Sequence, residues 1–281
     1  MTLTIRQALD HAAERLRQAG IDNPRLDARL LLAHALAITP DRLLRDLTAH
    51  VDPTALEPLL TRREAREPLA LIVGKREFWS LEFAVSAATL IPRPESETLI
   101  EAALTAFADR TPPRRALDLG TGTGCLLLAA LSEFPAAFGI GVDRSPAAIA
   151  LAAHNAAMLD MADRAAFVCA DWAAALYGRF DLILCNPPYI PRSELPELMP
   201  EVARYEPRSA LEGGLDGYSA YRELLPNLRP LLRSDGVAIL EVGAGQAKSV
   251  AELAREAGFS TIFRQDLSGI VRTLVLQSPP T

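Results

Sequence analysis

A short apolar run that ends in two consecutive prolines carries the first residues able to do chemistry. It is Phe180-Asp-Leu-Ile-Leu-Cys-Asn-Pro-Pro-Tyr-Ile190, and it predicts a buried strand followed by a rigid loop. Because each proline fixes φ and lacks an N–H, the backbone after Asn186 can join neither a sheet ladder nor a helix. The acceptors left there, the Asn186 side-chain oxygen and the Pro187 carbonyl, suit the two N–H bonds of a planar amide or exocyclic amine. The candidate catalytic and substrate-binding residues are Asn186, Pro187, Pro188 and Tyr189.

The Asn-Pro-Pro-Tyr loop alone is equally compatible with a plain turn, since asparagine and proline are common turn residues. Tetrapeptides of this kind also occur in methyltransferases that modify a planar nitrogen, in adenine, cytosine or glutamine. The choice between these interpretations depends on whether a cofactor site lies elsewhere in the chain.

A glycine-rich segment provides that second site. Asp118-Leu-Gly-Thr-Gly-Thr-Gly124 follows one predicted strand and precedes a helical pattern, and its alternating glycines let the backbone approach a ligand where a Cβ would clash. Asp143 ends the next predicted strand, where a carboxylate can accept hydrogen bonds from two ribose hydroxyls. We therefore expect cofactor contacts from Gly120, Thr121, Gly122, Thr123, Gly124 and Asp143.

Three features favour S-adenosylmethionine over the nucleotide of a dehydrogenase. The glycine spacing is G-x-G-x-G rather than G-x-G-x-x-G, and Asp118 precedes it. Asp171-Trp172 follows the third predicted strand, where an aromatic ring can flank adenine and a carboxylate can accept from its amine. Packing at a helix start is the simpler role for Trp172. Together with Asn186, which we also expect to contact the cofactor, the set is typical of methyltransferases.

The elements that would position these motifs alternate between strand and helix over residues 114–276. Strands are predicted at 116–119, 139–142, 166–169, 181–185, 237–242, 261–264 and 271–276, and helices near 125–133, 146–159, 172–176, 219–232 and 246–257. This alternation indicates right-handed βαβ units and a seven-stranded, mostly parallel sheet covered by helices on both faces. Because only residues 265–270 join the last two strands, we expect that pair to be antiparallel.

The N-terminal part has a helical pattern over residues 4–70. A capping residue followed by proline recurs at Asn23-Pro24, Thr39-Pro40 and Asp52-Pro53, as is usual where helices begin. From residue 69 to residue 90 the pattern alternates and predicts a β-hairpin. We divide the chain into a helical substrate-docking domain (1–75), a β-hairpin connector (76–92) and a methyltransferase domain (93–281).

Composition excludes several functional classes. The 281 residues are 49% hydrophobic and 23% charged, enough for a large and a small core, and the net charge of −6 counts against nucleic-acid binding. Cys125, Cys169 and Cys185 are isolated in apolar stretches, so we expect core residues rather than metal ligands. We find neither a secretion signal nor an apolar run of about 18 residues, so we expect a cytoplasmic chain without a membrane partner.

The chain resembles a known family, the HemK-type peptide chain release factor N5-glutamine methyltransferases of bacteria, over nearly its whole length. The matching segments are Leu90-Ile-Pro-Arg-Pro-Glu-Ser-Glu97, 118–124, Asp143, 171–172, 186–189, Tyr205-Glu-Pro-Arg208 and Ala210-Leu-Glu-Gly-Gly-Leu-Asp-Gly217. Ser96 is a departure, since the family usually has threonine there.

The resemblance implies a class I (Rossmann-like) methyltransferase fold, with S-adenosyl-L-methionine as cofactor and S-adenosyl-L-homocysteine as product. It implies methyl transfer to the glutamine nitrogen of the Gly-Gly-Gln motif in class 1 release factors, and a substrate-binding role for Glu206 and Arg208. We expect a monomer. Three alternatives are a glutamine methyltransferase for a ribosomal protein, a DNA adenine methyltransferase, which the acidic charge opposes, and a non-enzymatic binding module, which would have lost some of these motifs.

Overall fold

The contacts of the computed structural model, which describes residues 2–174 and 176–278, divide the chain into two units. We call Met1–Lys75 together with Leu198–Tyr205 the helical unit, and Arg76–Glu197 together with Glu206–Thr281 the sheet unit. The segment Leu198–Tyr205 therefore packs with a part of the chain that is far away in sequence. None of the helices within the described ranges combines the length and apolar content needed to span a bilayer.

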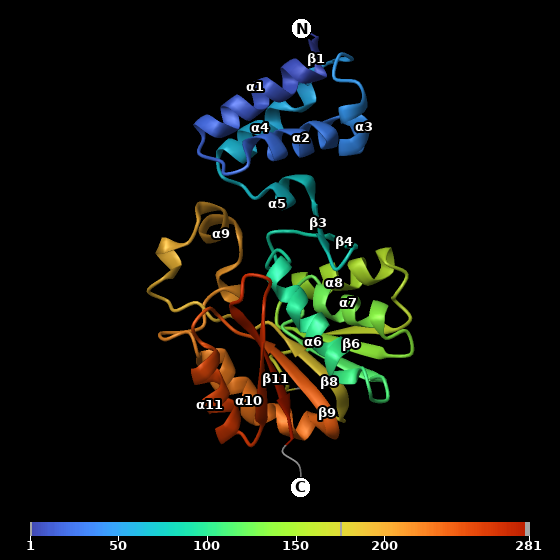
Figure 1. Ribbon diagram of the computed structural model, residues 1–281, viewed down its shortest axis with the longest axis vertical. Helices are drawn as coiled ribbons and strands as arrows, with labels where there is room; N and C mark the ends of the chain where they lie inside the picture. The colour runs from blue at the N-terminus through green and yellow to red at the C-terminus, as the bar shows by residue number, and fades with distance from the viewer. Residues whose placement is uncertain (1, 175, 279–281) are drawn as a thin grey trace. The chain divides into compact units, whose positions relative to one another are not determined.

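The helical unit consists of short helices (Figure 1), and their buried side chains form a core rich in leucine and alanine. The helices are α1 (Ile5–Gln18), α2 (Pro24–Ala35), α3 (Pro40–Arg45), α4 (Glu57–Glu64), α5 (Leu69–Val73) and α9 (Pro200–Tyr205). Thr4 and Gln7 cap α1 reciprocally, each side chain accepting from the other backbone N–H. Each predicted capping pair does begin a helical segment, although Asp52-Pro53 begins only the short 3-10 turn Pro53–Ala55.

Three features of this unit were not predicted. The strands β1 (Leu3–Thr4) and β2 (His50–Val51) form a two-residue antiparallel pair, and α5 occupies a stretch that we had included in the strand-like segment. Helix α9 is the third. A buried ion-pair network holds it: Arg63 binds Asp27 at 2.7 Å and Glu201 at 3.1 Å, and Arg66 donates to Glu201 at 2.9 Å.

The sheet unit contains all seven predicted strands. These are β5 (Arg115–Leu119), β6 (Phe138–Asp143), β7 (Ala165–Cys169), β8 (Phe180–Cys185), β9 (Leu232–Glu241), β10 (Ser260–Gln265) and β11 (Val271–Gln277). Their order is β10-β11-β9-β8-β5-β6-β7, and β11 pairs antiparallel with both β9 and β10. The predicted mostly parallel sheet and its antiparallel end are confirmed.

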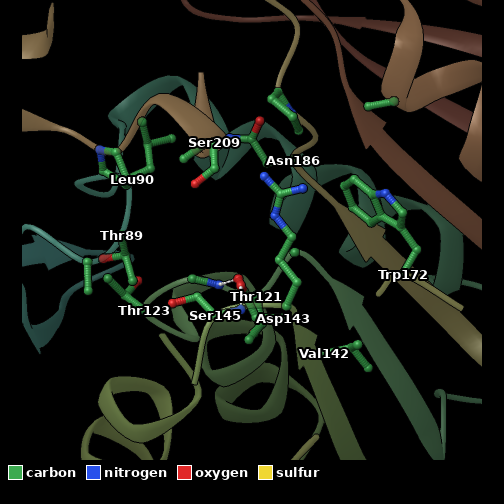
Figure 2. Close-up of a pocket in the computed structure, with 18 of the residues that line it drawn as sticks. Thr89, Leu90, Thr121, Thr123, Val142, Asp143, Ser145, Trp172, Asn186 and Ser209 are labelled. Atoms are coloured by element: carbon green, nitrogen blue, oxygen red, sulfur yellow. Dashed lines mark hydrogen bonds between the residues drawn. The ribbon is translucent and has the colours of Figure 1, made fainter. Parts of the chain in front are cut away.

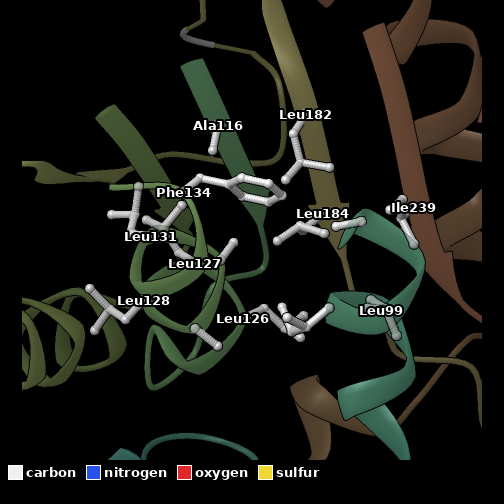
Figure 3. Close-up of a cluster of buried hydrophobic side chains, with 14 of the residues drawn as sticks. Leu99, Ala116, Leu126, Leu127, Leu128, Leu131, Phe134, Leu182, Leu184 and Ile239 are labelled. Atoms are coloured by element: carbon white, nitrogen blue, oxygen red, sulfur yellow. The ribbon is translucent and has the colours of Figure 1, made fainter. Parts of the chain in front are cut away.

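Helices cover both faces of the sheet because side chains alternate along each strand. One face, with Ala116, Leu184 and Ile239, packs against α6 (Glu97–Phe107) and α7 (Cys125–Glu133), as Figure 3 shows. Helix α8 (Pro146–Met158) contacts β6 and β7. The other face, with Leu117, Ile183 and Leu240, packs against α10 (Ser219–Leu231) and α11 (Ala247–Glu256).

A β-hairpin precedes the sheet, as predicted. Strands β3 (Lys75–Phe78) and β4 (Leu81–Ala84) are joined by Trp79 and Ser80, whose φ values of 53° and 58° form the tight turn. The Asn155 side chain on α8 ties the hairpin to the glycine-rich loop, because it accepts from the Ala84 N–H at 2.8 Å and donates to the Thr123 carbonyl at 2.9 Å.

Two predictions for the sheet unit were wrong. Residues 172–174 form a turn instead of the start of a helix, because Trp172 adopts a φ of 43°, in the left-handed region that a helix excludes; residue 175 of that predicted helix lies outside the described residues. Cys169 is exposed, whereas Cys185 is buried. Cys169 lies on β7, a strand at the edge of the sheet, where fewer layers cover the side chains.

Truncating a core side chain of β8 tests this packing. Leu184 is fully buried between the sheet and its helices, so Leu184→Ala should lower the free energy of unfolding by about 2–5 kcal/mol through the cavity it leaves. The matched control is Leu267→Ala, at a fully exposed position, which should change it by less than about 0.5 kcal/mol. Urea denaturation followed by tryptophan fluorescence measures both; equal effects would contradict the packing.

Candidate functional site

A cavity of about 580 Å³ lies at the carboxyl edge of the parallel strands. All of its lining residues belong to the sheet unit. The segments that follow β5, β6, β7 and β8 meet there because parallel strands end at one edge, and β5 lies between β8 and β6 where the strand order reverses. Open α/β sheets bind ligands at such reversals.

The glycine-rich loop forms one wall of the cavity. Gly120 has a φ of +74°, and a Cβ built on it would lie 3.4 Å from the Trp172 ring, so a side chain there would be both strained and crowded. Below the loop, the Thr121 hydroxyl donates to Asp118 at 2.6 Å. Burial raises the pKa of Asp118 to about 7, and the Thr121 hydrogen bond opposes the rise. Asp118 thus supports the loop from within the core.

Asp143 lies where β6 ends and lines the cavity. Its two oxygens accept from the Gly122 N–H at 3.0 Å and from the Ser145 N–H at 2.9 Å. A carboxylate has about four acceptor positions, so further lone pairs are available to a diol. Asp143 therefore shapes the glycine-rich loop and presents acceptors to a ligand.

Trp172 and the segment before α6 stand on opposite sides of the cavity. Figure 2 shows Thr89 and Leu90 across from the Trp172 ring, with Asp143 between them. The left-handed backbone of Trp172 brings its ring over Gly120, and Asp171 lines the same wall. The Trp172 ring thus presents an aromatic surface to a ligand at the wall beside Gly120.

Two buried hydroxyls at the cavity have no hydrogen-bond partner in the described chain. They are the Oγ1 atoms of Thr89 and Thr123, and both residues line the cavity. Buried polar atoms are rarely left unpaired, so these two hydroxyls are available to the polar atoms of a ligand in the cavity. With the acceptors of Asp143 and the Trp172 ring, they fit the amino-acid, ribose and adenine parts of S-adenosylmethionine.

The proline-rich loop contributes to the cavity through only part of its length. Asn186 and Pro188 line it, whereas Pro187 and Tyr189 are not among its lining residues. The Asn186 Nδ2 atom donates to the Ser96 hydroxyl at 3.2 Å. The Tyr189 hydroxyl donates to Glu241 at 3.3 Å, and burial raises the pKa of Tyr189 well above its ordinary value.

The two predicted substrate residues after the loop lie in different surroundings. Glu206 is buried and absent from the cavity wall; it pairs with Arg93 and accepts from the Ile91 N–H at 3.1 Å. Arg208 lines the cavity, is exposed and pairs with Glu212. The carboxylate of Glu206 therefore holds the segment that carries Ile91 and Arg93, and only Arg208 presents its side chain at the opening.

Sequence reasoning missed one charged residue beside Asn186. Glu241, at the end of β9, is only 2% exposed, and burial raises its pKa to about 7. A carboxylate within the otherwise apolar run Val237-Ala-Ile-Leu-Glu-Val242 was the signal available.

Family models cover most of the helical unit and about half of the sheet unit. Residues 7–74 match the PrmC N-terminal domain, and residues 96–201 match the methyltransferase small domain. A protein of Rhodospirillum rubrum named release factor glutamine methyltransferase is 46% identical, over 97% of this chain and 85% of its own. Its namesake in Cereibacter sphaeroides is 47% identical over 97% of this chain and 98% of its own. The chain belongs to the release factor glutamine methyltransferase family. The enzyme is therefore a methyltransferase whose cofactor is S-adenosyl-L-methionine.

Solved structures support the fold at much lower identity. A methyltransferase of Pyrococcus furiosus aligns with a TM-score of 0.52 at 18% identity, over 70% of this chain and 88% of its own. The hMettl16 catalytic domain, solved with an RNA hairpin, aligns with a TM-score of 0.53 at 17% identity, over 78% of this chain and 81% of its own. These similarities concern the fold alone.

Removing the Asp143 carboxylate tests the cofactor site. Asp143→Ala should weaken S-adenosylmethionine binding by about 1–3 kcal/mol, because it removes acceptors and leaves the Gly122 N–H unpaired. Isothermal calorimetry measures the affinity, and circular dichroism checks the fold. Asp163→Ala, at an exposed position outside the cavity wall, is the matched control. A folded Asp143→Ala variant with unchanged affinity would refute the assignment.

Proposed function

We propose that the enzyme transfers a methyl group from S-adenosyl-L-methionine to the N5 side-chain amide nitrogen of the glutamine in the Gly-Gly-Gln motif of class 1 peptide chain release factors. The relatives named release factor glutamine methyltransferase, similar over nearly the full chain, are the observation that carries this proposal. The position of Asn186 on the cavity wall is consistent with it.

Asn186 holds the substrate amide by accepting one of its N–H bonds. Its own Nδ2 atom donates to Ser96, which leaves Oδ1 as the acceptor. Within residues 2–174 and 176–278, no protein donor bonds to the Asn186 Oδ1 atom or to the Pro187 carbonyl. In our proposal the Asn186 Oδ1 atom binds one N–H bond of the glutamine amide from the cavity wall, and the carbonyl of Pro187, the next residue of the same loop but itself outside the cavity lining, binds the other and so fixes the amide plane.

Orientation is the main contribution of these residues to the rate. An amide nitrogen is a weak nucleophile because its lone pair is delocalised into the carbonyl, so it must be held close to the methyl carbon, at about 3–3.5 Å, and aligned with it. The bound cofactor supplies an electrophilic methyl group on a positively charged sulfur. Methyl transfer would form an N–C bond as the C–S bond of the bound cofactor breaks, and the amide nitrogen would give up a proton. Pro188 shapes the wall beside the reacting amide.

Truncating Asn186 tests its proposed role. Asn186→Ala should leave S-adenosylmethionine affinity nearly unchanged and lower kcat by about a hundredfold, because a misplaced nucleophile costs on that order. Asn227→Ala, an exposed helix position whose side chain bonds only to its own helix, is the control. Methylation of purified release factor, followed by mass spectrometry, is the measurement. A parallel loss of folding and activity would instead assign Asn186 a structural role.

The helical unit serves, in this proposal, as a second contact for the release factor. Specific protein interfaces bury about 1,200–2,000 Å², far more than a short Gly-Gly-Gln loop provides, so contacts away from the glutamine are needed. Every residue that lines the cavity lies outside the helical unit, which leaves that unit free for docking. Helix α9 of the helical unit is followed in the chain directly by Glu206.

A chain that lacks residues 1–75 tests this division of labour. It should bind S-adenosylmethionine, because it keeps the whole cavity wall, but it should methylate intact release factor far more slowly, mainly through a higher KM. A short Gly-Gly-Gln peptide provides the control, since its methylation should change little. If the peptide reaction falls equally, loss of α9 contacts has disturbed the cavity; if intact release factor is methylated normally, the docking role is wrong.

A further inference from the structure

A chain of hydrogen bonds runs from Asn186 into the core behind the cavity. The Asn186 Nδ2 atom donates to the Ser96 Oγ atom at 3.2 Å, and the Ser96 hydroxyl donates to the Glu241 Oε2 atom. The Tyr189 hydroxyl donates to the other carboxylate oxygen of Glu241 at 3.3 Å. Ser96 is 3% exposed and Glu241 is 2% exposed, so water competes little for these bonds. We call Asn186, Ser96 and Glu241 the amide relay.

The register of the sheet brings the amide relay together. Cys185 at the end of β8 pairs with Leu240 of β9, so the next residues, Asn186 just after β8 and Glu241 at the end of β9, lie side by side. Ser96 closes the gap from the short 3-10 turn Pro94–Ser96 that precedes α6. On the other side of β9, Thr273 of β11 pairs with Glu241.

The charge of Glu241 sets the direction of every bond in the relay. An ionised carboxylate only accepts hydrogen bonds, so the Ser96 hydroxyl must donate to it. The remaining lone pairs of Ser96 can then only accept, which selects the Nδ2 side of the Asn186 amide and turns Oδ1 away from Ser96. A protonated Glu241 can donate instead, and Ser96 is then free to donate to Asn186 Oδ1.

We propose that Ser96 and Glu241 are positioning residues that fix the orientation of the Asn186 amide, so that its oxygen faces the substrate. This inference deepens the proposed function and rests on the acceptor role of Asn186. Only the amide orientation with Oδ1 free offers an acceptor to the substrate N–H; the flipped amide presents a donor to a donor. The two orientations of the Asn186 amide have nearly the same shape, and the amide relay selects the one that can accept a hydrogen bond from the substrate.

The groups around Glu241 place its titration near neutral pH. Burial raises the pKa of Glu241 to about 7; the hydrogen bonds from Ser96 and Tyr189 and the charge of Arg272 oppose the rise, and Glu95 adds to it. From the other packed elements, the Tyr221 hydroxyl donates to the Glu241 backbone carbonyl, and burial, with a smaller contribution from the charge of Glu241, raises the pKa of the Cys125 and Cys185 thiols.

The sign of the pH effect follows from this titration. The relay needs the ionised carboxylate, so the fraction of correctly oriented Asn186 falls as pH drops through about 7. Stability changes in the opposite sense. A carboxyl whose pKa is raised in the folded state stabilises the fold below its unfolded pKa, and this contribution is lost as pH rises through the folded pKa. As pH rises and Glu241 ionises, we therefore expect activity to increase and the stability of the fold to decrease.

Variants at Ser96 separate orientation from packing. Ser96→Ala should lower kcat by about ten- to a hundredfold, with cofactor affinity unchanged, because the Asn186 amide can then flip. Ser96→Thr keeps a hydroxyl and should restore most of that loss. Ser96→Cys keeps the volume with a weaker hydrogen-bonding group, and serves if Ser96→Ala does not fold. Thr273→Val, which removes a buried hydroxyl bonded to Thr98 outside the relay, is the matched control.

Two measurements decide the proposal. In the first, kcat of the wild type should fall as pH drops through about 7, and Glu241→Gln should abolish that dependence. The second is side-chain amide NMR of ¹⁵N-asparagine-labelled enzyme, which reports the Asn186 NH2 group without any methyl transfer. Its protection from exchange should be lost in Ser96→Ala and at low pH, whichever substrate the enzyme uses.

Failure of the relay and failure of the proposed function are distinguishable. If Ser96→Ala keeps both the wild-type kcat and the protected Asn186 NH2 group, or if Thr273→Val loses as much activity as Ser96→Ala, the relay is refuted. If release factor is not methylated but the NMR protection changes as expected, the relay is supported and only the substrate assignment fails.

Discussion

The shared carboxyl edge of the parallel strands is the constraint on which the rest of the structure depends. Strands β5, β6 and β8 run in one direction and are hydrogen-bonded side by side, so whatever follows each of them must emerge at the same edge. The glycine-rich loop, Asp143 and Asn186 are therefore neighbours in space although they are distant in sequence. The two layers of helices hold this edge by burying the alternating side chains of the strands.

Hydrogen bonds from residues outside the sheet hold the segments that surround the cavity at this edge. Asn155 on α8 holds the carbonyl of Thr123 and both backbone polar groups of Ala84, while the buried carboxylate of Glu206 holds the Ile91 N–H and Arg93. The contacts to Thr123 and to Ile91 hold loop segments, which have few apolar side chains of their own to bury. These hydrogen bonds tether the loops that line the cavity.

Buried carboxylates recur behind the cavity. Asp118 supports the glycine-rich loop through Thr121, and Glu241 supports the proline-rich loop through Ser96 and Tyr189. Burial raises both pKa values to about 7. The free energy of unfolding therefore falls as pH rises and each group ionises. Such groups stabilise a fold less than apolar residues of the same size would. Their contribution is to orient polar loops at one edge of the sheet.

The sequence by itself determined which segments form the seven strands, that the sheet is mostly parallel, and where the predicted cofactor and amide motifs lie along the chain. Alternating apolar residues, glycines and prolines act over short distances, so their consequences can be derived locally. The residues of the Asp118–Gly124 loop and Asn186 were found in this way, and the family resemblance agreed with them.

Only the tertiary structure decided which polar groups meet across the fold. The left-handed backbone of Trp172, the exposure of Cys169 on an edge strand and the burial of Glu206 depend on neighbours that are distant in sequence. The same holds for the pairing of Ser96 with Glu241 and of Arg63 with Glu201, across 145 and 138 positions. Local propensity carries no information about such contacts, because their partners are set by strand register and helix packing.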